Sequence, residues 1–132
     1  MSVSKLQDYR SKQKLLYVAN PGPEILRHYG DLFFAAGNFS DALDFYQKAN
    51  FTDGLHKIRS AALDSGDVMN FQRAAKALNM ELTSADWEII AKNALDLKKY
   101  QFARHALEKA DNKDLLSSLE KIMHAEGHEK VS

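Results

Sequence analysis

The sequence matches itself when it is shifted along its own length by 61 residues. Under this shift bulky residues meet bulky residues and small residues meet small ones. The matched pairs are Leu26 with Trp87, Gly30 with Ala91, Phe39 with Tyr100, Ala42 with Ala103, Ala49 with Ala110, Asp53 with Asp114 and Leu55 with Leu116. Two helices approach closely only where their side chains are small, so this alternation of size is typical of packed helices. The chain is therefore predicted to be built from a repeated helical unit.

The spacing of apolar residues predicts helices along the whole chain. Glycine and proline fall at few places, and the segments between them are rich in Ala, Leu, Lys, Glu and Gln, which favour helices. We expect eight helices, at about residues 4–19, 23–36, 39–50, 53–65, 67–79, 84–97, 99–110 and 113–125, and a flexible tail over 127–132. Each connection is a short turn, so neighbouring helices should lie antiparallel. The expected fold class is all-α, in a single domain over residues 1–132.

Residues that end and begin helices stand at several of these boundaries. Gly37 suits the left-handed position that follows a helix. Asn38 with Asp41, and Thr83 with Asp86, have the spacing of reciprocal capping pairs. One helix is therefore predicted to end just before Gly37, and new helices are predicted to begin after Asn38 and Thr83.

The repeating unit is expected to be a helix hairpin of about 30 residues, present three times, because the 61-residue shift is about twice that length. The first hairpin carries Leu26, Tyr29, Gly30, Phe33, Gly37, Phe39, Ala42, Tyr46 and Ala49, and the third carries Trp87, Ile90, Ala91, Ala94, Tyr100, Ala103, Leu107 and Ala110. This pattern resembles the tetratricopeptide repeat over about residues 23–110. The resemblance implies a right-handed stack of antiparallel hairpins, an αα superhelix, with helices 4–19 and 113–125 flanking or capping it.

The middle hairpin departs from the tetratricopeptide pattern. Gly37 to Gly66 spans 29 residues, whereas a tetratricopeptide repeat has about 34. Arg59 stands where the family has a small residue, and Phe71 stands where it has alanine. In the third hairpin Lys98 replaces the usual turn glycine. We therefore expect the middle hairpin to pack at an altered angle.

A narrow polar stripe marks the predicted helix over residues 23–36. Its members recur at helical spacing, while most of the remaining circumference is apolar, so the stripe is expected to face solvent. In the tetratricopeptide resemblance these positions line the concave surface of the stack, which predicts a partner-binding face. Its candidate residues are Glu24, Arg27, His28, Asp31, Asp53, His56, Lys57, Ser60, Glu88, Lys92 and Asp96, with Phe34 at the edge of the groove.

Several members and neighbours of this face have more than one possible role. Family members that capture a C-terminal carboxylate carry Lys and Asn at the positions of Arg27 and Asp31, and the negative charge of Asp31 would repel such a ligand. A clamp for chain termini is therefore not expected.

His28 and His56 either respond to pH or form ordinary surface hydrogen bonds. Phe34, and Phe51 in the following turn, either anchor a partner or pack against an adjacent hairpin.

Composition and missing motifs exclude several classes of function. Eighteen Lys and Arg residues balance 18 Asp and Glu residues, so no overall charge draws the chain to nucleic acid or to a membrane surface. The sequence holds no nucleotide-binding or hydrolase motif and no complete set of metal ligands. We expect no enzyme activity, no catalytic residue, no metal and no cofactor. The lack of cysteine and of an apolar leader or spanning segment predicts a cytoplasmic protein.

The leading prediction is a non-catalytic adaptor or scaffold that binds a peptide or helix of another protein on the concave face. One alternative is a homo-oligomer formed through the terminal helices, and another is an enzyme or small-ligand receptor with an unrecognised site. The basic helix over 4–19 is expected to pack its apolar side on the first hairpin and to keep its lysines in water. Alternatively, this helix contacts phosphates, a membrane surface or a neighbouring subunit.

Overall fold

The computed structural model describes residues 12, 14, 16 and 21–127. Within these residues it contains seven α-helices and no strand. The helices are α3 (Pro23–Ala35), α4 (Phe39–Lys48), α5 (Thr52–Ser65), α6 (Val68–Ala77), α7 (Ser84–Asp96), α8 (Tyr100–Ala110) and α9 (Lys113–Ala125). The all-α class is confirmed, and each of these helices begins and ends within two residues of its predicted bounds. The predicted helix over 4–19 and the tail over 127–132 lie almost wholly outside the described residues.

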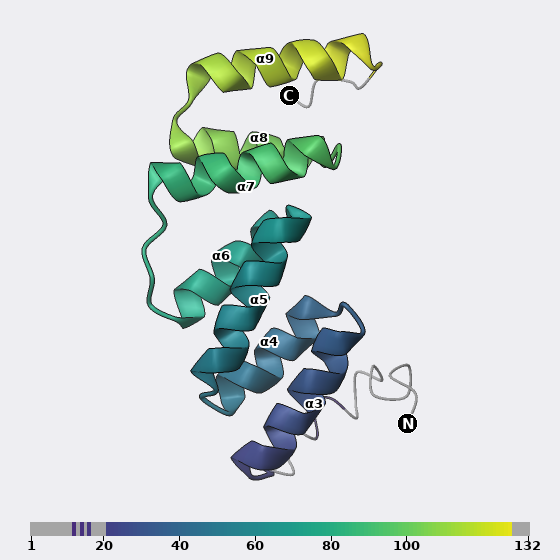
Figure 1. The fold of residues 1–132 in the computed structure, drawn as a ribbon, viewed down its shortest axis with the longest axis vertical. Helices are drawn as coiled ribbons and strands as arrows, with labels where there is room; N and C mark the ends of the chain where they lie inside the picture. The colour runs from purple at the N-terminus through teal and green to yellow at the C-terminus, as the bar shows by residue number, and fades with distance from the viewer. Residues whose placement is uncertain (1–11, 13, 15, 17–20, 128–132) are drawn as a thin grey trace.

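Consecutive helices pack against each other, and alternate helices also touch. The pairs α3 with α4, α5 with α6, and α7 with α8 are in contact, and α9 contacts α8. In addition α5 contacts both α3 and α7, while α6 contacts both α4 and α8. Figure 1 shows the pairs following one another along the long axis, from α3 at the bottom to α9 at the top. The helices α3, α5 and α7 therefore neighbour one another in chain order.

Every one of these seven helices is followed by a residue with left-handed backbone. These residues are Gly37, Asn50, Gly66, Asn79, Lys98, Asp111 and Gly127. At the first six, the next N–H donates to the carbonyl five residues earlier at 2.8 to 3.1 Å, which is the Schellman arrangement that satisfies the open end of a helix. Lys98 adopts this conformation, with φ 59°, despite its side chain.

The 61-residue shift reappears in the backbone. It carries the left-handed residues Gly37, Asn50 and Gly66 onto Lys98, Asp111 and Gly127. The three helices α3, α4 and α5 therefore correspond, end for end, to α7, α8 and α9. In space, α5 contacts both α3 and α4, and α9 contacts α8.

The buried apolar residues form two clusters that meet in the middle hairpin. The first cluster draws on α3, α4 and α5, and includes Leu55 and Ile58. The second draws on α7, α8 and α9, and includes Ala62 and Phe71 from the middle hairpin. Because α5 and α6 contribute to both clusters, the middle hairpin joins the two halves of the molecule.

The small residues of the repeat are buried between packed helices. Gly30 is buried, and Ala42, Ala91 and Ala103 are at most 2 % exposed. A Cβ atom on Gly30 would lie 2.5 Å from the ring of Tyr46. That position therefore admits nothing larger than glycine unless the ring shifts.

Most of the larger pattern residues are also buried, with a few exceptions. Gly37 is exposed at its turn, and Tyr29, Phe39 and Ala49 are half-buried. The repeat pattern predicts a buried Phe39, but its ring instead stacks on the half-buried Phe34 at 5.5 Å. The aromatic residue that begins α4 thus packs at the edge of the core rather than inside it.

The two exceptional residues of the middle hairpin pack on each other. The guanidinium of Arg59 lies 4.9 Å above the buried ring of Phe71. Arg59 also lies 3.9 Å from the carboxylate of Asp86, which connects α5 to α7. A cation of α5 thus covers the large aromatic ring of α6 in a favourable cation–π contact.

Two predictions about helix starts have different outcomes. Thr83 and Asp86 form the full capping box, in which each side chain bonds the other residue's backbone N–H. Asn38 is the N-cap of α4, but its side chain caps nothing, so the capping prediction is wrong there. Thr83 is extended with ψ 166° and Asn38 has ψ 75°, but Asp67 and Asn112 have ψ 82° and 88° and do accept a capping bond, so the backbone angle does not explain the difference.

Lys12 corrects the prediction that the N-terminal lysines stay in water. Its ammonium lies 2.6 Å from the carboxylates of both Asp41 and Asp44 on α4, and its side chain is only 14 % exposed. Burial opposes this charge, but the hydrogen bonds to the two carboxylates outweigh it and raise the pKa of Lys12. Leu16 is buried in the first cluster, which confirms that an apolar residue of this segment packs on the first hairpin.

Candidate functional site

The predicted binding residues lie along α3, α5 and α7, which are neighbours in the fold. Ten of the twelve are exposed, and Phe34 and Glu88 are half-buried. The opposite sides of the same helices hold buried residues of the two clusters. We call these twelve residues the polar face: Glu24, Arg27, His28, Asp31, Phe34, Asp53, His56, Lys57, Ser60, Glu88, Lys92 and Asp96.

Between α3 and α5 the polar face is tied together by Asp31. The Tyr46 hydroxyl donates to the Asp31 carboxylate at 2.5 Å, and the Lys57 ammonium lies 3.9 Å from the same carboxylate. Burial raises the pKa of Tyr46, and the bond to Asp31 raises it further. A buried hydroxyl therefore holds one exposed carboxylate of the face in a fixed position.

Cations cover the aromatic rings at the same place. The Lys57 ammonium lies 4.6 Å from the centre of the Phe34 ring, and the Arg27 guanidinium lies 4.0 Å from that of Phe51. The Phe51 ring in turn meets Tyr46 edge-on at 5.4 Å. Of the two roles that the sequence allows for Phe34 and Phe51, the structure places both rings in packing contacts. These contacts also order the two cations.

On α7 the charges of the polar face are less engaged. Glu88 accepts a hydrogen bond from the Asn112 amide at 3.2 Å, at the start of α9. Lys92 and Asp96 are exposed and form no ion pair within the described part of the chain. Ile89, next to Glu88, is 49 % exposed and was missed by the sequence analysis. An apolar residue bordering a polar helix stripe was the signal that could have found it.

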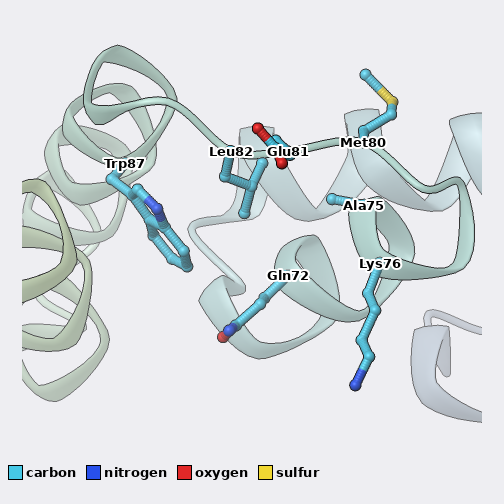
Figure 2. A pocket seen from close by; sticks show the side chains of 7 residues that line it. All are labelled: Gln72, Ala75, Lys76, Met80, Glu81, Leu82 and Trp87. Carbon is cyan, nitrogen blue, oxygen red and sulfur yellow. The ribbon is translucent and has the colours of Figure 1, made fainter.

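An open cleft lies on another side, where α6 connects to α7. It has a volume of about 420 Å³ and is lined by Gln72, Ala75, Lys76, Met80, Glu81, Leu82 and Trp87. In Figure 2 the side chains of Leu82 and Trp87 turn toward the same space above Gln72. The cleft has a clear origin, because three more residues separate the left-handed residue from the next helix here than in the α4–α5 and α8–α9 connections. Trp87, only 7 % exposed, fills part of the resulting gap as a core residue.

Other kinds of site find no support in the described part of the chain. Its residues contain no group of three or more histidine, aspartate and glutamate side chains placed to hold a metal ion. None of the seven helices is both long enough and apolar enough to cross a membrane. Comparison with protein-family models, with curated proteins and with solved structures found no match. A function is therefore inferred from the polar face itself.

Proposed function

We propose that this chain is a non-catalytic protein-interaction module of tetratricopeptide type. Its hairpins form a right-handed stack, and the polar face lines the concave side, where it binds an extended or helical segment of another protein. The supporting observation is that three neighbouring helices expose polar residues of both charges while burying their other sides in the core. A surface of this kind recognises its partner by charge complementarity and by the area it buries.

The side-chain contacts within the polar face hold two of its cations in place before a partner binds. Arg27 is stacked on Phe51, and Lys57 is held between Phe34 and Asp31. Side chains that are already ordered lose less conformational entropy when a partner docks. Lys92 and Asp96 are exposed and form no ion pair among the described residues, so both are accessible to a partner's charges.

The test is a selection of displayed random peptides on the whole chain. The recovered peptides are then measured by fluorescence anisotropy against wild type and against the double variant Arg27→Glu/Lys92→Glu. We expect the double variant to bind them at least tenfold more weakly, because it reverses two charges of the face. A matched control, Lys76→Glu/Lys109→Glu, reverses two exposed charges on α6 and α8 and should leave affinity unchanged. Equal loss in both double variants, or loss in neither, refutes the polar face as the binding surface.

A further inference from the structure

A cleft beside α4 and α6 is lined by two cations and two side-chain amides. Its volume is about 510 Å³, which lies within the range of about 300–1,000 Å³ that is typical of ligand pockets. The residues that line it are Leu43, Gln47, Arg73, Lys76, Ala77 and Asn79. The guanidinium and the ammonium offer only N–H donors, each amide offers an NH₂ group, and this lining includes no acid. The α4–α6 cleft is therefore suited to an anion.

The matching positions of the next hairpin lack this positive charge. The left-handed residues Asn79 and Asp111 are 32 residues apart, and the same shift places the start of α6 on the start of α8. It takes Arg73, Lys76 and Asn79 to His105, Glu108 and Asp111. Two cations and a neutral amide thus correspond to one histidine and two acids. The excess of donors belongs to the α4–α6 cleft and is not a general property of the repeat.

The guanidinium of Arg73 is held in place, and its charge is balanced. It donates to the Asp44 carboxylate at 3.0 Å. Asp44 also accepts from the Lys12 ammonium at 2.6 Å, and Lys12 donates to Asp41 at the same distance. Two cations thus face two carboxylates, so the charge of Lys76 is left over. The cleft therefore combines a preordered guanidinium with one surplus positive charge.

Lys76 is exposed and forms no ion pair within the described part of the chain. Figure 2 shows its side chain pointing away from Leu82 and Met80. Lys76 lies in the last turn of α6, where a cation also offsets the partial negative charge of the helix end. Lys109 occupies the last turn of α8 and has the same effect there. Lys109 is therefore a matched control, because it shares the helix-end role but does not line the cleft.

We propose that the α4–α6 cleft binds a small, singly charged carboxylate. Its oxygens accept hydrogen bonds from Lys76, from the free N–H groups of Arg73 and from the amide of Asn79. A carboxylate carries one negative charge, which equals the surplus, whereas a phosphate group carries about 1.5 to 2 near pH 7. The site lies on helices that do not carry the polar face, so it goes beyond the proposed function and does not depend on it.

The probe is sodium butyrate, titrated at millimolar concentration into the ¹⁵N-labelled whole chain. NMR follows the side-chain amides of Gln47 and Asn79 and the Nε of Arg73, and we expect saturable shifts at all three. Sodium chloride and butylammonium chloride at the same ionic strength should produce none. Saturation by sodium phosphate but not by butyrate overturns the carboxylate assignment. Shifts that chloride reproduces overturn the site itself.

The variant Asn79→Asp tests the cleft with the smallest change in shape. Asp111 adopts the same left-handed backbone, with φ 55° against 56° for Asn79, so the melting temperature should not fall. The added carboxylate should weaken butyrate binding about threefold or more. Lys76→Gln should weaken it by a similar factor, about threefold, whereas Lys109→Gln should leave it unchanged. Wild-type affinity in both Asn79→Asp and Lys76→Gln contradicts the proposal, whatever the outcome of the peptide selection.

Discussion

At position 30 the backbone of α3 lies against the ring of Tyr46, so the two residues depend on each other. In the second half the matching positions hold Ala91, which is larger than Gly30, and Leu107, which is smaller than Tyr46. The two pairs have about the same total volume, but they divide it differently between the residue on the first helix and the residue on the second. Size alternation in the sequence was enough to predict that these four positions are buried, because small residues recur at helical spacing where two helices pack closely.

Gly30→Ala should destabilise the protein by about 1–3 kcal/mol, because the new methyl group overlaps the Tyr46 ring. This range is the net effect, after a gain of about 1 kcal/mol in helix propensity has offset part of the steric cost. Urea denaturation provides the measurement. Adding Tyr46→Leu recreates the Ala91–Leu107 pair, so the double variant should be more stable than the sum of the single changes indicates. Strictly additive effects would show that the two residues are not coupled, and Gly22→Ala, with open space around it, is the control.

The Tyr46 hydroxyl gives the fold a dependence on alkaline pH. Its pKa is raised in the folded state, so its contribution to stability is complete below the ordinary tyrosine value of about 10 and is lost as the pH rises above it. Tyr46→Phe should cost about 0.5–1.5 kcal/mol at neutral pH through the lost bond to Asp31. The difference in unfolding free energy between wild type and variant should shrink as the pH is raised past the ordinary tyrosine pKa. A constant difference over that range would contradict the role given to the hydroxyl.

Other contacts of single residues lay beyond sequence reasoning. The bonds from Lys12 to Asp41 and Asp44, and from Tyr46 to Asp31, join residues 15 to 32 positions apart. Periodicity places each residue on a face of its own helix, but it does not say which side chain of another helix it will meet. Exposure of the polar face could therefore be predicted, whereas its internal pairing could not.

At the scale of a single helix, the ends divide into those that the sequence reveals and those that it does not. Gly37 indicates a left-handed position in the sequence, because glycine adopts that backbone without steric cost. Asn50, Asn79, Lys98 and Asp111 adopt it as well, and their side chains are weaker signals. The Schellman bonds at these ends satisfy the last carbonyls of the helix although the left-handed residue is not glycine.

Thr83→Ala should destabilise α7 by about 0.5–2 kcal/mol, because it removes the side chain that bonds the Asp86 backbone. Asn38→Ala is the matched control, since Asn38 occupies the same position of α4 and its side chain makes no capping bond. The two variants are compared by thermal denaturation followed by circular dichroism. An equal loss in both variants would show that the capping box contributes nothing beyond the N-cap residue type.

In the whole molecule, the middle hairpin connects the two apolar clusters, because α5 and α6 contribute residues to both. The sequence predicted all seven of these helices and flagged Arg59 and Phe71 as exceptions, but it did not show that they contact each other. The cleft of Figure 2 was also missed, because a connection longer by three residues has no periodic signal.

Phe71→Ala should cost about 3–5 kcal/mol and should loosen α8 more than α4, because Phe71 belongs to the cluster of α7, α8 and α9. Phe45→Ala is the counterpart in the first cluster and should show the reverse preference. Amide hydrogen exchange resolves the two helices. If each variant lowers the protection of amide hydrogens uniformly along the chain, the two clusters unfold as one unit and are not independently stable.

The exposed polar sides of α3, α5 and α7 are proposed to form one binding surface, on which the function of the molecule depends. The most direct measurement is an amide NMR shift map of the whole chain with a peptide recovered from the displayed library. We predict saturable shifts concentrated on these three helices, including Arg27, His56 and Lys92. Shifts concentrated instead on α4, α6 and α8 would contradict the proposal.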